Sequence, residues 1–563
     1  MKSTILLTMA AALCAGSAFA AAPGITGPTF NLTAQDAYLN QPDGEAVYSW
    51  GYGCNGTPAG FAPAAIGNTY CNSMQVPGPT LIVTEGNTVT VTLTNNLPAA
   101  AGNTSILFPG FNVTAGAAAT QPTTCTSTPP APQGLMVAEA SHGCTVTYTF
   151  TASTPGTHAY YSGTQGDLQI EMGLFGAVIV LPKTPGGTGG CATIFSTNKT
   201  AQSHWGEHNF TLSSAAYDDP HTCYDREYLF QFSEIDSNIH KTAQAQVTTL
   251  AGCTAGAAGC VLSVPTEPYH PAYFMINGRS MPDDMDPNYD ATEYPHQPYN
   301  GNPHLHPGEQ VLLRIIGQGR WQHPFHEHAN HVRILARDGN LILTPDGQQL
   351  AGPPLFTTTT TPGVAMDGIF YFTGRGLNWD MYGHTAVSTS KDTLATLPCT
   401  PDGNGYNTGD PTAVNYFEWC QDHNKPLEAT PFGDVTAGGP TTLPNPNIFT
   451  NGNWYGGSPY LGPDATLRAT TTLRPVAGAT GPNSAASGSA GCVTGTAGAP
   501  TSAPNCSNLM PSNTQANPAN ERGFAFMWHS HNEREITTNN VFPGGMMMMM
   551  LVDSREFVID ESN

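Results

Sequence analysis

The strongest constraint on the fold of this chain is a set of short segments in which apolar and polar residues alternate. The clearest runs from Thr88 to Asn95, directly after a Glu85-Gly86 turn, and another runs from Cys144 to Phe150. Successive side chains of a strand point to opposite faces, so a period of two predicts half-buried antiparallel sheet. The 61 Gly and 48 Pro residues favour frequent turns over long helices. We therefore expect an all-β fold.

Similar strand patterns occur in two parts of the chain. The first part ends in an apolar run at 173–181. The second part contains comparable runs at 274–278, 307–316, 331–335 and 368–372. This repetition of pattern predicts two tandem β-sandwich units.

The pattern disappears between about residues 373 and 520, where a low-complexity run occupies 476–503. Stretches of this length without strands are uncommon inside a domain, so we interpret it as a loop-rich insertion, a flexible lid or a degenerate third domain. The predicted order is a signal peptide, a first domain, the first part of a second domain, the insertion, and the last strands of the second domain. The corresponding boundaries are 1–20, 21–185, 186–372, 373–520 and 521–563.

The N-terminus has the pattern of an export signal. Lys2 precedes an apolar run from Ile5 to Gly16, and a small-x-small cleavage pattern follows at 18–20. No later segment approaches the roughly 20 apolar residues that cross a bilayer. The mature chain is expected to be exported, periplasmic or extracellular, and not inserted in a membrane.

The cysteine content fits an oxidising compartment. Cys14 lies in the signal sequence, which leaves an even number of twelve from the total of 13. They fall into six pairs of sequence neighbours, for which local disulfides are the simplest arrangement: Cys54 with Cys71, Cys125 with Cys144, Cys191 with Cys223, Cys253 with Cys260, Cys399 with Cys420, and Cys492 with Cys506.

The charge balance limits the possible partners. The formal net charge is −23, with only 18 Lys and Arg residues. An acidic surface repels nucleic acid, so a nucleic-acid partner is excluded. Metal ions or a small-molecule substrate are the expected partners.

Two histidine clusters lie about 200 residues apart. Each contains a His-x-His core that places two imidazoles on one face of a strand, namely His326 with His328 and His529 with His531. Imidazole-rich sets without carboxylates suit copper or zinc rather than magnesium or calcium. We predict that these four histidines converge on one metal site.

The order of motifs resembles the multicopper oxidases, whose repeating unit is the cupredoxin Greek-key sandwich. Residues 76–86 resemble the opening of that family's first domain, and residues 173–180 resemble its last strand. His323-Pro-Phe-His326-Glu-His328 is similar to the family's His-Pro-x-His-Leu-His segment. Trp528-His529-Ser530-His531, followed by Gly545-Met546, is similar to its His-Cys-His segment and the Gly-Met that follows. The resemblance implies tandem cupredoxin-like domains and a copper cofactor.

The departures from the family pattern bear on mechanism. Ser530 stands where the family has the type 1 copper cysteine, and by spacing Glu535 replaces that site's second histidine. A serine hydroxyl cannot act as the soft thiolate donor that gives type 1 copper its electron-transfer character. The first-domain segments that resemble ligand segments, 104–109 and 156–163, lack both His-x-His pairs, with Tyr161 and Gly163 at the ligand positions of the second. The type 1 motif is thus degenerate and the trinuclear motif incomplete.

Three further histidines are weaker candidates. His323 matches the family's other type 1 histidine, although a solvated or hydrogen-bonded histidine explains it equally well. His304 and His306 form another His-x-His pair that could supply the missing ligands, but two surface histidines are the simpler interpretation.

Two functional hypotheses follow. The first is an exported copper-binding oxidoreductase-like protein with a histidine-only site, acting on metal ions or small organic molecules. The second is a non-catalytic copper-binding or structural extracellular scaffold on the same fold. Zinc suits four histidines chemically but has no support from the resemblance. A homo-oligomer, in which a neighbouring subunit contributes ligands, is compatible with both hypotheses.

Overall fold

We describe the fold from a computed structural model. The structure describes residues 22–63, 73–117, 138–187, 214–372 and 523–553, together with the short pieces 71, 125, 191, 400–403, 407–409, 458–460 and 559. The predicted signal peptide and nearly all of the predicted insertion lie outside these residues.

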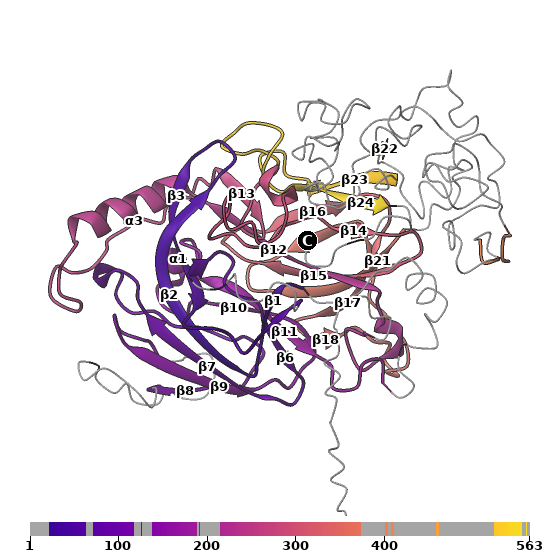
Figure 1. The fold of residues 1–563 in the computed structure, drawn as a ribbon, viewed down its shortest axis with the longest axis horizontal. Coiled ribbons are helices and arrows are strands. Elements are labelled where there is room, and N and C mark those ends of the chain that lie inside the picture. The colour runs from indigo at the N-terminus through magenta and orange to yellow at the C-terminus, as the bar shows by residue number, and fades with distance from the viewer. Residues whose placement is uncertain are drawn as a thin grey trace, which may run out of the picture.

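The described residues form four β-sheets, and the first two come from the N-terminal part of the chain (Figure 1). Sheet I has the order β5 (Met74–Gln75), β3 (Ala46–Cys54), β2 (Thr29–Asn40), β7 (Thr88–Asn95), β9 (Thr145–Thr151) and β8 (Thr114–Ala117). Sheet II has the order β10 (Gly156–Tyr161), β11 (Phe175–Leu181), β6 (Leu81–Thr84), β1 (Gly24–Thr26) and β4 (Gly60–Ala62).

The other two sheets come from later parts of the chain. Sheet III has the order β13 (Tyr273–Ile276), β12 (Arg226–Ile235), β15 (Gln310–Gly317), β21 (Ala365–Tyr371), β17 (Val332–Arg337) and β18 (Asn340–Leu341), with β19 (Pro354–Leu355) paired to β17. Sheet IV has the order β14 (His304–Leu305), β24 (Met547–Asp553), β23 (Gly523–Ser530), β16 (His323–Glu327) and β20 (Thr357–Thr360), with β22 (Ser458–Tyr460) paired to β23.

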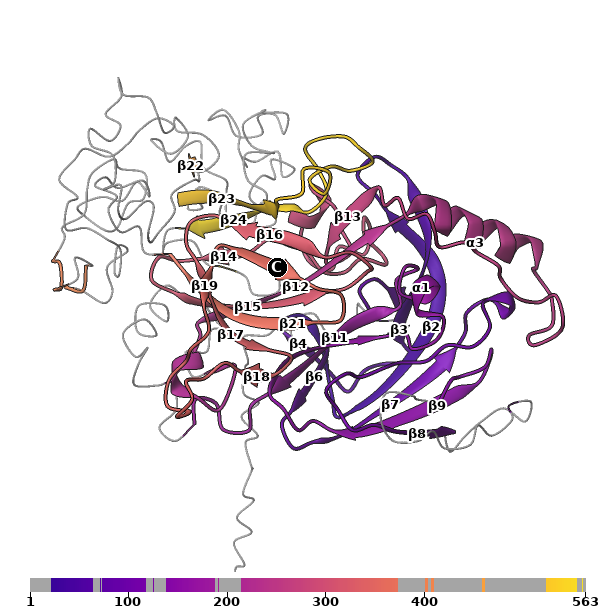
Figure 2. The same cartoon turned by 180° about the vertical axis from the view of Figure 1, so that it is seen from behind.

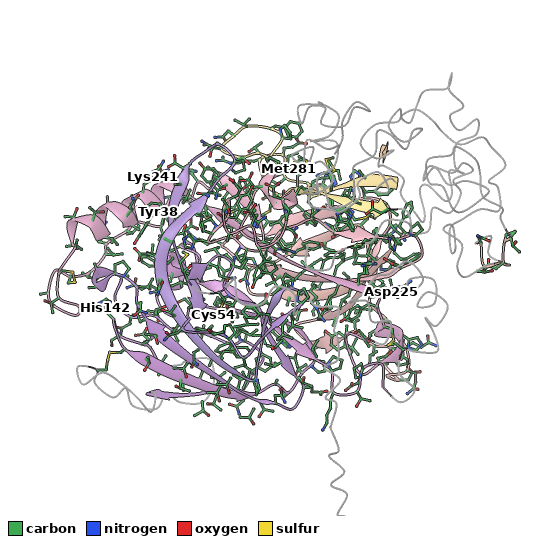
Figure 3. The ribbon with its side chains drawn as sticks, viewed as in Figure 1. Tyr38, Cys54, His142, Asp225, Lys241 and Met281 are labelled. Atoms are coloured by element: carbon green, nitrogen blue, oxygen red, sulfur yellow. A yellow bond between two sulfur atoms is a disulfide. The ribbon has the colours of Figure 1, made fainter. Side chains whose placement is uncertain are left out.

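Helices are few among the described residues. The longest is α3 (Ser237–Thr249), whose N-terminus is capped by the Asp236 carboxylate through the backbone N–H of Asn238. It lies against the β2–β3 side of the molecule, near the labelled Tyr38 and Lys241 (Figure 3). The others are single turns: α1 (Gly166–Gln169) and 3-10 turns at Ala99–Ala101, Pro220–Thr222 and Asp283–Met285. None of the described helices is long and apolar enough to cross a membrane.

The sheets stack in the order I, II, III, IV, and Figure 2 shows the same arrangement from behind. Strand β11 is buried on both faces because Val178 and Val180 face the core shared with sheet I. Its alternate residues Ala177 and Ile179 pack instead with Leu229 of sheet III. A further core joins sheets III and IV through residues such as Phe232, Phe325 and Trp528. The expected all-β fold of tandem cupredoxin-like sandwiches is confirmed.

The alternating segments form the strands that their patterns predicted. Thr88–Asn95 is β7, with the burial alternation expected of a strand that has one face toward the core. It pairs antiparallel with β9 from Thr88 opposite Thr151 to Thr94 opposite Thr145. Local periodicity therefore located these strands correctly.

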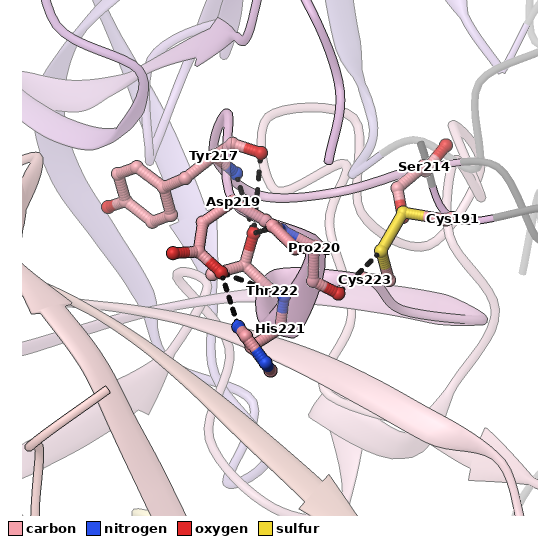
Figure 4. The surroundings of a disulfide bond; sticks show 8 residues. All are labelled: Cys191, Ser214, Tyr217, Asp219, Pro220, His221, Thr222 and Cys223. Carbon is pink, nitrogen blue, oxygen red and sulfur yellow. Dashed lines mark hydrogen bonds and ion pairs between the residues drawn. A yellow bond between two sulfur atoms is a disulfide. The ribbon is translucent and has the colours of Figure 1, made fainter. Parts of the chain in front are cut away.

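Four of the six expected disulfides are present: Cys54–Cys71, Cys125–Cys144, Cys191–Cys223 and Cys253–Cys260. The other two predicted pairs lie outside the described residues. Figure 4 shows the Cys191–Cys223 bridge beside a tight turn in which the backbone N–H of His221 donates to Asp219 at 2.8 Å. Each bridge closes a local loop, as the sequence spacing suggested.

Candidate metal centre

The two histidine motifs lie on neighbouring strands. β16 pairs antiparallel with β23, and His326 lies directly opposite His529. Phe325 and Trp528 are buried in the core between sheets III and IV. Because side chains alternate along both strands, the histidines of the two His-x-His pairs occupy the opposite, outward face of sheet IV.

The four imidazoles form a compact cluster, defined here as His326, His328, His529 and His531 and called the four-histidine cluster. The ring centroids of His326 lie 4.5 Å from His531, 4.8 Å from His328 and 5.7 Å from His529. The ring of His529 lies 5.3 Å from that of His328 and 5.2 Å from that of His531. The four imidazoles therefore lie close together on one face of sheet IV.

The spacing of one pair of nitrogens fits a shared metal ion. The Nε2 atoms of His529 and His328 lie 3.3 Å apart. Two imidazole nitrogens at about 2.0–2.1 Å from one tetrahedral ion are separated by about 3.3 Å. No three His, Cys, Asp or Glu side chains within the described ranges already form a complete metal-holding group. His326 and His531 lie beside this pair, with their ring centroids 4.5 Å apart.

Protonation and ring orientation also suit metal binding. Burial and the three neighbouring imidazoles lower the pKa of His326 to about 4, and burial lowers the pKa of His529. Both rings are therefore neutral at pH 7, the state that binds metal. The Nδ1 of His529 donates to the carbonyl of Ser530 at 2.8 Å, which leaves the lone pair on Nε2, facing His328.

The opposite face of the same strands carries a different arrangement. His323 is buried between two carboxylates, with Nε2 3.0 Å from Glu234 and Nδ1 3.0 Å from Glu535. The Nδ1 contact has the distance of an ion pair without the alignment of a hydrogen bond. Ser530 is buried as well, and its hydroxyl donates to Glu535 at 2.5 Å. We call these four residues the inner-face network.

The inner-face network holds a buried positive charge. Burial by itself would lower the pKa of His323, but the close contacts with the charged carboxylates of Glu234 and Glu535 outweigh it and raise this pKa to about 9. His323 is therefore an imidazolium at neutral pH, directed at carboxylates. It is hydrogen-bonded and buried, and it is not solvated.

Sequence reasoning missed Glu234, which lies on β12, 89 residues before His323. The local sequence around Glu234 gives no signal of its partner, because β12 also carries Glu227 and other polar residues. Only the packing of sheet III against sheet IV brings Glu234 and His323 together. The same holds for Thr357 of β20, whose hydroxyl lies 3.0 Å from Nδ1 of His326.

The expectation that His304 and His306 are surface residues is wrong, because both are almost completely buried. His304 Nδ1 lies 2.6 Å from Asp553, and His306 Nδ1 lies 3.0 Å from Glu309. Carboxylates at Nδ1 account for their burial by supplying a charged hydrogen-bond partner.

Glu327 and three residues of the methionine run at 546–550 are buried in the core. Glu327 points to the core side of β16, where Thr358 donates to it at 2.7 Å, and burial raises its pKa to about 8. Met546, Met548 and Met550 all belong to the core between sheets III and IV. Core packing therefore explains the methionines.

The first-domain positions that lack histidine lie in another layer. Tyr161 is half-buried and packs with residues of sheets II and III, including Ile179 and Leu229. The four-histidine cluster lies on the far face of sheet IV. The first domain of the same chain therefore does not face the cluster.

The comparisons with known proteins agree with the fold. Residues 67–185 match the family model described as multicopper oxidase. This part of the chain is therefore similar to the multicopper oxidases. The matched residues form part of the first domain, so the four-histidine cluster lies outside them.

Several solved structures are similar over long stretches. A blue copper oxidase from Nitrosomonas europaea has 14% identity, covering 93% of this chain and 85% of that one, with a TM-score of 0.39. A copper nitrite reductase from the same organism has 20% identity over 62% and 85%, with a TM-score of 0.34. A laccase from Botrytis aclada has 17% identity over 64% and 52%, with a TM-score of 0.33. Values this low support no conclusion about activity. No curated protein matches the sequence.

Proposed function

We propose that this protein is an exported copper-binding oxidoreductase-like member of the multicopper oxidase superfamily, and that the four-histidine cluster is its copper site. The observation that supports this most is the convergence of four imidazoles, with two Nε2 atoms 3.3 Å apart. Copper bound there would supply one-electron redox chemistry. Its substrates would be metal ions or small organic molecules.

The chain's own residues would prepare this site. His326 and His529 are neutral and need not lose a proton to bind. Thr357 and the Ser530 carbonyl orient their rings through Nδ1. His531 is exposed, so a small molecule can approach the cluster from solvent. His323, by contrast, is excluded from this set by its position on the other face.

A second candidate is a non-catalytic copper-binding or structural scaffold. The inner-face network favours it, because Ser530, Glu535 and His323 occupy the positions of the family's electron-transfer copper site and satisfy one another instead. Without that relay, copper binding does not by itself provide a route for electrons between a substrate and the cluster.

Metal analysis and electron paramagnetic resonance of copper-loaded protein test the site. We expect one type 2 signal without intense blue absorption, and its loss in a His529→Ala/His531→Ala variant. A His221→Ala/His270→Ala variant, which removes the same number of imidazoles at exposed positions elsewhere, is the control and should keep the signal. Copper binding that is unchanged in the first variant would contradict the assignment.

Oxygen uptake separates the two candidate functions. Ferrous, manganous and phenolic substrates are tested with the copper-loaded protein beside the His529→Ala/His531→Ala variant. Uptake that depends on these histidines supports an oxidoreductase. Stoichiometric copper binding without turnover of any substrate supports the scaffold. Gel filtration of the metal-free and loaded forms tests the proposed homo-oligomer.

A further inference from the structure

The segment that carries His529 and His531 is held from its inner face by one carboxylate. Glu535 accepts from the Ser530 hydroxyl at 2.5 Å through Oε2 and from the Asn532 side chain at 2.8 Å through Oε1. The Ser530 hydroxyl in turn accepts from the backbone N–H of Asn532 at 3.1 Å. The turn after His531 is therefore closed around the Glu535 side chain.

Glu535 is itself fixed on two sides. Its backbone carbonyl accepts from Met546 N–H at 2.7 Å, beside Gly545, where a Cβ would lie only 2.1 Å from that carbonyl oxygen. Gly545 also has a φ of +65°, which favours glycine. The carboxylate of Glu535 lies 3.0 Å from the His323 imidazolium.

His323 links this turn to sheet III. Its Nε2 lies 3.0 Å from Glu234, whose other oxygen accepts from the backbone N–H groups of Arg320 and Trp321, each at 2.7 Å. Tyr269 also contacts this oxygen, at 3.2 Å. The charge held by the network is thus anchored to the rigid interior of the second sandwich.

We propose that Glu535, through Ser530, is the positioning residue for His529 and His531, and that its ion pair with His323 holds the segment from within in place of a metal ion. The effect of Glu535 on copper binding rests on the proposed function. Its role in ordering the segment that carries His529 and His531 does not depend on copper. A buried ion pair linked to hydrogen bonds on both partners fixes geometry more firmly than an isolated hydrogen bond. Residues that orient metal ligands change metal affinity by about 10–100-fold when they are replaced.

The variants separate this role from general stability. Glu535→Ala removes the carboxylate, and Ser530→Ala removes only the hydroxyl that joins it to the histidine segment. Glu533→Ala is the matched control, since Glu533 lies two residues away in the same turn but is exposed. Thermal unfolding of each metal-free variant shows which of them fold.

The first measurement needs no metal. In metal-free protein, hydrogen exchange of the amides at 529–532 should be at least about tenfold faster in Glu535→Ala than in the wild type, and unchanged in Glu533→Ala. If Glu535→Ala does not fold, Ser530→Ala should show the faster exchange at these amides. Exchange at the wild-type rate in the folded variants would overturn the proposal, whether or not the protein binds copper.

The second measurement uses copper alone as the probe. Affinity from calorimetric titration should fall about 10–100-fold in Glu535→Ala and less than about threefold in Glu533→Ala. The copper hyperfine splitting should change in the first variant only. Folded Glu535→Ala with wild-type affinity and splitting would overturn the proposal. Absence of copper from wild-type protein would instead refute the proposed function, leaving the exchange result to decide the positioning role.

Discussion

Histidines on the two faces of sheet IV have opposite protonation states: His326 and His529 on the outer face are neutral, and His323 on the inner face is positively charged. On the outer face, His326 and His529 have lowered pKa values and form part of a cluster of imidazoles. On the inner face, His323 has a raised pKa and lies between two carboxylates. Burial opposes charge on both faces, so the neighbours decide. Imidazole neighbours favour the neutral histidine, which can bind a metal. Carboxylate neighbours favour the protonated histidine, which balances their negative charge.

This contrast explains how the fold tolerates Ser530. A buried carboxylate without a partner is costly, and a metal ion or a protonated histidine can each compensate it. Here His323 does so for Glu234 and Glu535. The charges of the inner face are therefore balanced without a metal, whereas the outer face carries the proposed copper site.

The largest expected effect is on the inner face. His323→Ala leaves Glu234 and Glu535 buried without their shared cation, which should lower the free energy of unfolding by about 3–5 kcal/mol. Urea unfolding of the metal-free protein measures this. A loss below about 1 kcal/mol would show that the imidazolium is not the compensating charge.

On the outer face, the corresponding change should affect metal binding more than folding. His326→Ala should weaken copper binding by at least about 100-fold, or about 2.7 kcal/mol, because it removes one of four ligands. The free energy of unfolding of the metal-free protein should change by less than about 1 kcal/mol. Calorimetric copper titration beside urea unfolding checks both. If His326→Ala lowered the free energy of unfolding as much as the free energy of copper binding, the two faces would not differ in role.

The pH dependence of stability should separate the faces as well. The pKa of His323 is raised from 6.5 to about 9 in the folded protein, so its stabilising contribution is complete below about pH 6.5 and is lost as the pH rises through about 9. The gap in unfolding free energy between wild type and His323→Gln should therefore narrow from pH 6 to pH 10. A gap that is constant over this range would contradict a buried imidazolium.

The smallest effect is expected at the rim of the outer face. Phe356 is 53% exposed, and its ring lies 5.7 Å from that of His326 and 5.1 Å from that of His331. Phe356→Ala should change the free energy of unfolding by less than about 0.5 kcal/mol, as for most surface substitutions. A loss of several kcal/mol by urea unfolding would mean that this face is structural like the inner one.

The sequence by itself determined the all-β class, the four described disulfides and the fact that each His-x-His pair shares one face. These follow from strand alternation and from short loop closure, which depend only on residues close together in the chain. Serine in place of cysteine at position 530 was likewise visible, and with it the loss of a type 1 copper ligand.

Only the tertiary structure decided which partner each histidine meets. The register that sets His326 opposite His529 joins strands about 200 residues apart, and Glu234 reaches His323 from a different sheet. The burial of His304 also depends on a distant carboxylate neighbour, Asp553. A histidine's charge and role depend on the groups around it. Strand pairing and sheet packing over long sequence separations determine which groups these are. For this reason two of the three His-x-His pairs lie together as a candidate metal centre, the third is a pair of buried histidines, and His323 belongs to an ion-pair network.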